Sequence, residues 1–448
     1  AQGKWYFKQL FVNGERRNRT RLPRKGMYTV EGVPEIHSFS PDYWGAEGTF
    51  YCAPGDIKAW ENFTDIDVVA LHRWVAERLP LASFDEETRL VESSLNCIFP
   101  LENEHSQFPE YYVENVKEAL NEPGEWYLDR PTGQLYYIPM PGEVLESVEV
   151  YAPKAEQLIK LIGCPKDGQY VEHLSFKGLR FEHTEWTQPS GGGERWGELY
   201  QPLDYATAPQ GSCHIPGAIS LSGARYCAIK NCTIAHIGWS GIELTAGSQG
   251  IHIVNNTITD LGAGGIKIES MGIPNSVCAV EYRTGNNQIT DNHIYAGGRV
   301  FHEGHGIHSM DSFGNDISHN HIHDFFYSGI SCGWNWGYED NISRDNHIEK
   351  NHIHDIGHGL LSDMGCIYTL GVQPGTVVRG NLVHDVKKAV YGGWGIYLDE
   401  GSSHILVENN ISYNVNSEPY TVHYGRENIV RNNIFAFGRE AQVRLGRD

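Results

Sequence analysis

Asparagine followed closely by an aliphatic residue recurs from the middle of the chain to its end. The aliphatic positions of this repeat are Ile234, Ile258, Ile294, Ile322, Ile353, Val383, Ile411 and Ile434. They are 23 to 36 residues apart, a period typical of repeat architectures. Each repeat also carries an apolar stretch before the asparagine and another seven or eight residues after it. The pattern therefore predicts coils of three short strands each.

Stacked coils of this kind form a β-solenoid, in which alternate side chains are buried against the coils above and below. Asparagine suits one bend because its amide can hydrogen-bond the asparagine one coil away, and because it tolerates left-handed turns. We therefore predict an all-β chain in which residues 146–448 form a right-handed parallel β-helix. Residues beyond the shortest period mark loops, which often gather on one functional face.

The first third of the chain lacks this repeat and consists of strands and turns. A strand from Trp5 to Val12 is followed by the turn Asn13-Gly14, and a hairpin is predicted between Trp126 and Ile138. We predict a β-sandwich-like module over residues 1–145. The arginine-rich segment 16–24 is interpreted as a paired, solvated surface rather than a site for an acidic glycan.

Charge and composition exclude several partners. The chain has 35 Lys and Arg against 56 Asp and Glu, a formal charge of −21, which disfavours nucleic acid and anionic membranes. No membrane-spanning apolar run and no signal peptide are visible. The nine cysteines show no disulfide or metal spacing, and most are interpreted as core residues. We expect no cofactor and assign no metal site, while a structural Ca²⁺ and the oligomeric state stay open.

Strand alternation sorts the residues after each bend into interior and outward columns. The residues predicted to point inward are Ile219, Ile242, Ile266, Ile307, Ile330, Leu360 and Ile396. With these anchors, segments 358–365 and 394–401 align without a gap. The alignment predicts that Asp363 and Asp399 stack on adjacent coils, with backbones about 4.8 Å apart.

Two carboxylates this close cannot both ionise cheaply, so one pKa should rise well above the other. Cleavage of a glycosidic bond requires this division between an acid and a nucleophile. We predict that Asp363 is the general acid and that Asp399 is the nucleophile or base. The alternative is an aspartate ladder that caps turns or binds a cation such as Ca²⁺.

Aromatic and polar residues near the pair are predicted to bind a carbohydrate substrate, through ring stacking and hydrogen bonds to hydroxyl groups. These residues are Glu243, Glu269, His305, His308, Trp334, Trp336, Tyr391, Trp394, Tyr397, Glu400 and His423. Three His-Asp pairs recur on another side of the coil, and we interpret them as hydrogen-bonding ladders rather than metal ligands. They are His323-Asp324, His354-Asp355 and His384-Asp385.

Four segments resemble bacterial right-handed β-helix glycosidases, closest to glycoside hydrolase family 141 and more distantly to family 120 of β-xylosidases. The segments are Trp5-Tyr6-Phe7-Lys8-Gln9-Leu10-Phe11-Val12-Asn13-Gly14, residues 126–137, Ser362-Asp363-Met364-Gly365-Cys366-Ile367-Tyr368-Thr369-Leu370-Gly371 and Gly392-Gly393-Trp394-Gly395-Ile396-Tyr397-Leu398-Asp399-Glu400-Gly401. Family 141 includes α-L-fucosidase and xylanase activities.

The resemblance implies two catalytic aspartates at Asp363 and Asp399, and a secreted or periplasmic location. The acid/base glutamate of family 120 would fall near Val422-His423, where this chain has no carboxylate, so Asp363 is favoured as the partner. Members of the group carry further coils before the sandwich. We therefore expect that an N-terminal cap is missing from this chain.

The predicted function is hydrolysis of plant cell-wall glycans of the xylan, xylo-oligosaccharide or α-L-fucoside type. A polysaccharide lyase or epimerase is the second hypothesis, for which Lys267 is the only basic residue in the outward columns. The third is a glycan-binding solenoid without catalysis. Fold alone cannot separate the three.

Overall fold

The computed structural model describes residues 5–34, 48–102, 107–187, 206, 210–270 and 277–446. These residues form mostly short strands with a few 3-10 turns. Their contacts divide them into two compact units, one comprising the described residues up to 155 with 185–187 and 206, and the other the remainder. The domain boundary predicted between residues 145 and 146 stays a prediction.

The first unit contains two sheets, with strand orders β11-β10-β2-β1-β12 and β3-β9-β6-β7-β8-β5, and β4 beside β9. The strands are β1 (Leu10–Val12), β2 (Glu15–Arg19), β3 (Arg21–Leu22), β4 (Tyr28–Thr29), β5 (Thr49–Tyr51), β6 (Asp67–His72), β7 (Val75–Asp85), β8 (Leu90–Ser93), β9 (Glu110–Glu114), β10 (Glu125–Asp129), β11 (Gln134–Tyr137) and β12 (Val150–Tyr151). The predicted turn Asn13-Gly14 joins β1 to β2 with φ values of 53° and 76°, as a tight hairpin requires.

Ion pairs hold the arginine-rich segment of this unit. Arg17 contacts Glu143 at 2.5 Å and Arg19 contacts Asp67 at 2.7 Å. The arginines are paired as predicted, but both side chains are only 12% exposed. This segment is therefore more buried than the solvated surface that the sequence suggested.

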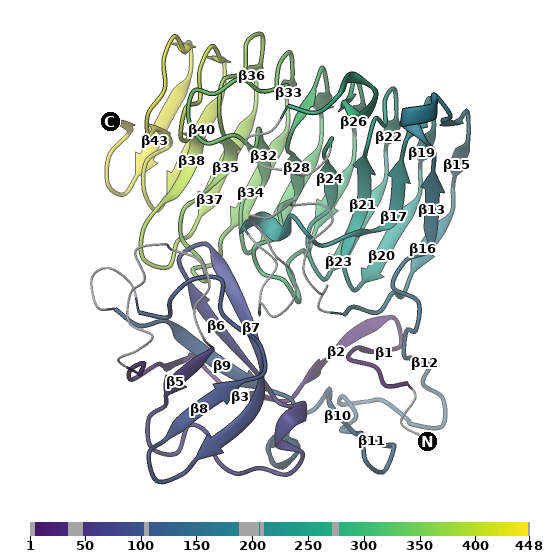
Figure 1. Cartoon of the computed structure of the whole chain (residues 1–448), viewed down its shortest axis with the longest axis vertical. Helices are drawn as coiled ribbons and strands as arrows, with labels where there is room; N and C mark the ends of the chain where they lie inside the picture. The colour runs from purple at the N-terminus through teal and green to yellow at the C-terminus, as the bar shows by residue number, and fades with distance from the viewer. Residues whose placement is uncertain are drawn as a thin grey trace. The chain divides into compact units, whose positions relative to one another are not determined.

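The second unit is a stack of coils whose strands form three long parallel sheets (Figure 1). The first sheet contains β13 (Ile159–Ile162), β17 (Gly217–Ser222), β21 (Ser240–Thr245), β24 (Ile266–Ile268), β28 (Ile307–Ser309), β32 (Ile330–Cys332), β35 (Met364–Thr369), β38 (Gly393–Leu398), β41 (Tyr420–Val422) and β44 (Val443–Leu445). The second contains β15 (Ser175–Lys177), β19 (Ala228–Lys230), β22 (His252–Val254), β26 (Gln288–Thr290), β30 (Asp316–Ser318), β33 (His347–Glu349), β36 (Val377–Arg379), β39 (Leu406–Glu408) and β42 (Ile429–Arg431). The third contains β16 (Arg180–Glu182), β20 (Thr233–Ile237), β23 (Thr257–Leu261), β27 (His293–Tyr295), β31 (His321–Phe325), β34 (His352–Ile356), β37 (Leu382–Val386), β40 (Ile411–Val415) and β43 (Ile434–Gly438).

Two short parallel pairs complete this unit in the described residues: β14 (Val171–Glu172) with β18 (Ala224–Arg225), and β25 (Thr284–Gly285) with β29 (Ser312–Phe313). Every strand pairing in the unit's named sheets is parallel and joins one coil to the next. The predicted parallel β-helix is therefore confirmed.

The asparagines of the repeat form a buried ladder between the second and third sheets. The amide of Asn351 donates to Asn381 at 3.0 Å and to the carbonyl of Ile317 at 2.9 Å, and it accepts from Asn320. The same bonds link the other members, which are Asn256, Asn292, Asn320, Asn381, Asn410 and Asn433. The predicted ladder is confirmed, although Cys232 rather than Asn231 occupies its first position.

Most of the cysteines lie in the core, as predicted. Seven of the nine are buried, and Cys164 and Cys278 are the exceptions. No helix in the described parts of the chain is long and apolar enough to cross a membrane.

The predicted interior column of the first sheet is correct at six positions and wrong at the seventh. Ile367, not Leu360, pairs with Ile330 on one side and Ile396 on the other. The segment 357–363 forms a turn before β35 and does not belong to the strand. The gapless alignment of 358–365 with 394–401 is therefore wrong, and Leu370 rather than Asp363 occupies the coil position next to Asp399.

Candidate active site

Asp363 and Asp399 flank two adjacent strands of the first sheet. Asp363 directly precedes β35, where its amide donates to the carbonyl of Tyr391 at 3.2 Å. Asp399 directly follows β38, where its amide donates to the carbonyl of Thr369 at 3.0 Å. Their backbones are thus not stacked, but the charge of Asp399 acts on Asp363. The two carboxyls therefore interact, although the predicted stacking of their backbones is wrong.

Three donors converge on the carboxylate of Asp399. The hydroxyls of Tyr368 and Tyr397 donate to its two oxygens, each at 2.6 Å, and Nδ1 of His423 lies 2.9 Å from Oδ1. Asp399 is buried, while the His423 side chain is 49% exposed. The hydrogen bond to Asp399 raises the pKa of His423, because a carboxylate acceptor favours the charged imidazole.

Asp363 has a different environment. Burial, and then the charge of Asp399, raise the pKa of Asp363 to about 8, while a hydrogen bond with Tyr397 acts in the opposite direction. The Tyr397 hydroxyl therefore reaches both carboxyls. The sequence predicted that one pKa of the pair rises well above the other, and the pKa of Asp363 is the raised one in this structure.

Aromatic side chains pack around the pair, but fewer are accessible than predicted. Trp334, Trp394 and Tyr397 are buried in a cluster that also contains Tyr368. The rings of Trp394 and Tyr397 lie 4.1 Å apart. These three residues therefore form the base of the site and are not the exposed stacking rings that the sequence suggested.

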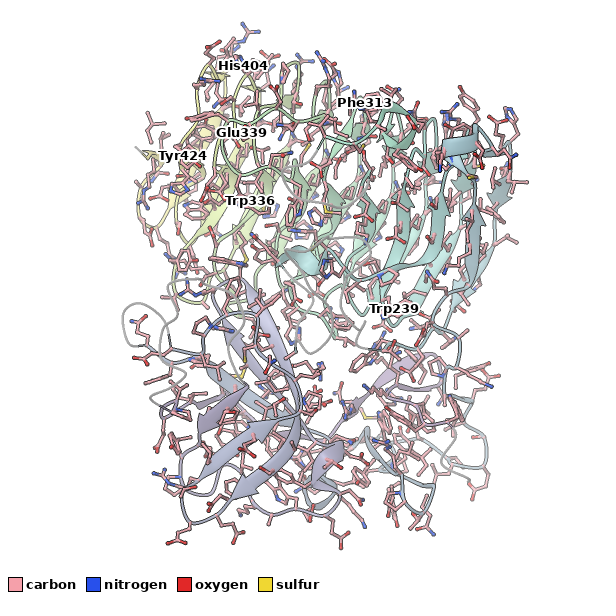
Figure 2. All side chains as sticks on the ribbon, viewed as in Figure 1. Trp239, Phe313, Trp336, Glu339, His404 and Tyr424 are labelled. Carbon is pink, nitrogen blue, oxygen red and sulfur yellow. The ribbon has the colours of Figure 1, made fainter. Side chains whose placement is uncertain are left out.

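The accessible rings are Trp336 and Tyr391. Trp336 is half-buried and packs against Trp334 with ring centroids 4.8 Å apart, and Tyr391 is 40% exposed. Figure 2 shows Trp336 and Tyr424 over the coils toward the C-terminal end of the β-helix. Tyr424 donates to the carboxylate of Glu400 at 2.9 Å, so Glu400 is held next to the pair.

The predicted ligands Glu243 and Glu269 lie in a buried ion network around Lys267. The Lys267 ammonium is 2.9 Å from Glu243 and 3.9 Å from Glu269, and it donates to the backbone carbonyls of Cys213 and Ile215. Both glutamates are almost completely buried. The structure thus groups them with Lys267, several coils before the Asp pair.

His305 and His308 are also buried. Burial lowers the pKa of His305 to about 3 and places that of His308 well below its ordinary value, so both rings are neutral at pH 7. His308 packs on Trp334 at 4.6 Å, and His305 packs on Tyr327 at 5.1 Å. The two histidines therefore support the aromatic base of the site.

Sequence reasoning missed three residues that support the site. Tyr368 binds Asp399, Tyr327 donates to the carbonyl of Asp363 at 2.9 Å, and Glu418 accepts from the indole of Trp394 at 2.7 Å. The repeated pair Ile-Tyr, at 367–368 and 396–397, was the signal that could have identified Tyr368. No comparable pattern marks the other two.

Comparisons with known proteins agree with this architecture. A family model described as "Right handed beta helix region" matches residues 217–393. A solved structure described as a glycoside hydrolase aligns with a TM-score of 0.73 and 22% identity, over 96% of this chain and 77% of that one. The second unit is a right-handed parallel β-helix.

Other solved structures align more loosely. XylC in complex with xylose gives a TM-score of 0.40 with 14% identity, over 92% of this chain and 58% of that chain. An alginate lyase from Paenibacillus sp. str. FPU-7 gives 0.33 with 14% identity, over 62% and 90% of the two chains. Neither likeness is close enough to carry an argument. No curated protein sequence matches the chain.

Proposed function

We propose that this chain is a glycoside hydrolase in which Asp363 is the general acid and Asp399 the nucleophile. The observation that carries the proposal is the different environment of the two interacting carboxyls. Burial and the charge of Asp399 raise the pKa of Asp363 to about 8, whereas three donors surround Asp399.

The general acid must hold its proton at working pH and release it to the departing oxygen of the glycosidic bond. A carboxyl with a pKa of about 8 is mostly protonated at pH 7. Asp363 is only partly buried, so its proton can reach a ligand at the surface. These two properties suit Asp363 to protonate the leaving group.

The second carboxyl must be negative and must point at the anomeric carbon. Hydrogen bonds from Tyr368 and Tyr397, and the contact with His423, stabilise the charge of Asp399 and fix the carboxylate plane. Such positioning is required of a nucleophile, because small displacements of the attacking atom cost much of the rate.

The shared Tyr397 hydroxyl bears on the stereochemistry. A hydroxyl within hydrogen-bonding reach of two carboxyls keeps their nearest oxygens within about 6 Å of one another. Retaining glycosidases have separations of about 5–5.5 Å, and inverting ones about 6.5–9.5 Å. This bound is compatible with the shorter separation, and we propose retention through a covalent glycosyl intermediate on Asp399.

Two observations bear on the alternatives and the substrate. A lyase or epimerase needs a partner for the uronate carboxylate, but Lys267 is buried and already contacts Glu243. The similar solved structure described as a glycoside hydrolase is consistent with hydrolysis. We propose a neutral plant cell-wall glycan of the xylan or α-L-fucoside type as substrate, and a secreted or periplasmic location.

The test is a panel of aryl fucosides, xylosides, arabinosides and galactosides together with xylan, assayed for released phenol and reducing ends. We expect hydrolysis of at least one substrate and a loss of at least about 10³-fold in Asp399→Asn. Asp363→Asn should lose about 10²–10⁴-fold on substrates whose leaving group requires protonation. Asp340→Asn, at an exposed position, should keep full activity. Full activity in both site variants would contradict the proposal, and an unsaturated product that absorbs ultraviolet light would identify a lyase.

A further inference from the structure

Six histidines form two stacked columns on the outer face of the third sheet, away from the Asp pair. One column contains His293, His321 and His352, and the other contains His323, His354 and His384. Within each column, neighbouring rings are nearly parallel and have centroids 4.8 to 5.0 Å apart. The parallel register of β27, β31, β34 and β37 produces these columns, because equivalent residues on adjacent coils lie one strand spacing apart.

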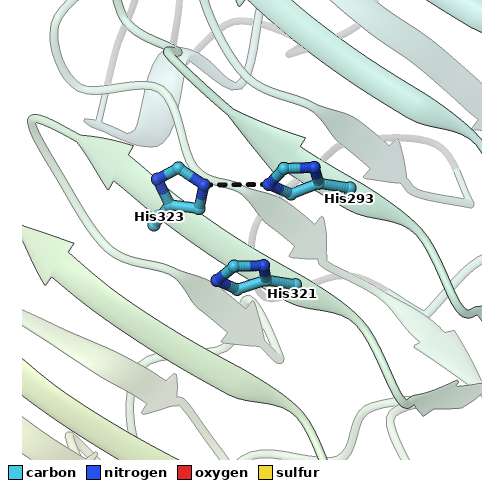
Figure 3. A group of neighbouring side chains, drawn as sticks. All are labelled: His293, His321 and His323. Atoms are coloured by element: carbon cyan, nitrogen blue, oxygen red, sulfur yellow. Dashed lines mark hydrogen bonds between the residues drawn. The ribbon is translucent and has the colours of Figure 1, made fainter.

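The two columns contact each other through ring nitrogens. Nε2 of His293 lies 2.9 Å from Nε2 of His323 (Figure 3). Nε2 of His321 lies 2.8 Å from Nε2 of His354. A third contact of 2.9 Å joins His352 to His384. In each contact one ring nitrogen donates its proton and the other accepts it. The accepting nitrogen therefore directs its lone pair at the ring of the other column.

Two overlapping triads result from this arrangement. The ligand nitrogens of His293, His321 and His323 lie within 4.8 Å of one another, and so do those of His321, His352 and His354. All of these rings are partly exposed, so an ion can reach them from solvent. His321 belongs to both triads.

We propose that this histidine cluster binds one divalent transition-metal ion, such as Zn²⁺, Ni²⁺ or Cu²⁺, in either of the two triads. Neutral imidazole is a preferred ligand of these ions. Because both triads include His321, we expect only one of them to be filled at a time. The fourth position would face solvent and accept water.

The geometry requires only a small adjustment. Nitrogens bound to a tetrahedral ion at 2.0–2.1 Å are about 3.3 Å apart, so a contact of 2.9 Å must open by about 0.4 Å while the third ring moves inward. Partly exposed rings can rotate by this amount. The ion would replace the proton between two nitrogens and join adjacent coils.

Carboxylates orient the second column. Nδ1 of His354 lies 2.8 Å from Asp355, and Nδ1 of His384 lies 2.7 Å from Asp385. A carboxylate on one ring nitrogen fixes the tautomer and makes the other nitrogen a better metal ligand. Asp324 instead contacts Arg299 and His358. The predicted ladder of His-Asp pairs is therefore present at two of its three positions, and it does not exclude metal binding.

The pKa values of the histidine rings also support metal binding. Burial and neighbouring imidazoles lower the pKa of His321 to about 4, and burial also lowers the pKa of His293, His323 and His352. A lowered pKa favours neutral imidazole, which is the form that binds metal ions.

The test is calorimetric titration of chelator-treated protein with Zn²⁺, with Co²⁺ absorption as a check of imidazole ligation. We expect one ion per chain for the wild type, and at least tenfold weaker binding in His321→Gln. His293→Gln and His352→Gln should each keep binding, because each leaves one triad complete. The double variant His293→Gln/His352→Gln should lose Zn²⁺ binding, because neither triad is then complete. His347→Gln, an exposed histidine on the second sheet, is the control and should bind as the wild type does.

Bound Zn²⁺ should also raise the melting temperature of the wild type and not that of His321→Gln. If His321→Gln does not fold, the double variant His293→Gln/His352→Gln decides, since it keeps the central ring. Equal Zn²⁺ binding by the wild type and the double variant would overturn the proposal, as would no binding by the wild type. The result does not depend on glycosidase activity.

Discussion

At the scale of single residues, Asp363 is distinguished by its carboxyl. Its φ of 63° is a left-handed turn conformation that Asp324, Asp355 and Asp385 also adopt. Burial and the charge of Asp399 raise the pKa of Asp363 to about 8. A carboxyl perturbed in this way is more consistent with function than with stability.

The pH dependence of the reaction follows from the same carboxyl. If protonated Asp363 is the acid, kcat/KM should fall as pH rises through about 8, because the proton is then lost. The measurement is a pH profile of kcat/KM on the best substrate. An activity that is unchanged from pH 7 to pH 9.5 would contradict this role.

The stability of the fold should also depend on the ionisation of Asp363. Its folded pKa lies above the unfolded value of about 3.8, so the folded state binds more protons between pH 4 and 8 and loses stability as pH rises across that range. Asp363→Asn removes this cost and suits φ of 63°. At pH 8 its melting temperature should be several degrees higher than that of the wild type. The corresponding gain in the free energy of unfolding is on the order of 2–5 kcal/mol.

Melting curves between pH 4 and pH 9 check this prediction. The difference between Asp363→Asn and the wild type should be small near pH 4 and reach a plateau near pH 8. Asp340→Asn should show no such trend. A variant that is less stable than the wild type at pH 8 would show that the carboxyl is not held neutral.

At the scale of elements, the repeat predicted the coils and the asparagine ladder, because both depend on spacing alone. It did not predict the register of β35. Leu360 and Ile367 both follow a glycine closely and both fit the interior pattern, and alternation cannot choose between them. The structure selects Ile367, which is fully buried between Ile330 and Ile396. The contact of Tyr368 with Asp399 depends on this register of β35.

The asparagine ladder gives the element-scale prediction. Asn351→Ala removes two donated bonds and leaves the amides of Asn320 without their acceptor. We expect a loss of about 2–4 kcal/mol, since buried polar groups without partners are costly. Urea denaturation measures it. His347→Ala, exposed on the same coil, should change stability by less than about 0.5 kcal/mol, and equal effects of the two variants would show that the ladder adds nothing.

At the scale of the whole molecule, sequence reasoning placed the two aspartates in one site, but by an alignment that is wrong. It could not foresee that Trp334, Trp394 and Tyr397 are buried, because periodicity assigns a face and not an exposure. It also separated the histidine columns from the Asp pair correctly, since they belong to a different strand of each coil. The net charge of −21 disfavours polyanionic partners, which agrees with the neutral glycan that we propose as substrate.

The roles of the two aspartates are tested most directly by changing the leaving group of the substrate. A dinitrophenyl glycoside departs without protonation, whereas an alkyl glycoside requires an acid. The measurement compares kcat/KM of Asp363→Asn and Asp399→Asn on both substrates. We predict that Asp363→Asn loses about 10²–10⁴-fold on the alkyl glycoside and about tenfold or less on the dinitrophenyl glycoside, while Asp399→Asn loses at least about 10³-fold on both. Equal losses on the two substrates in Asp363→Asn, or retained activity in Asp399→Asn, would contradict the assignment.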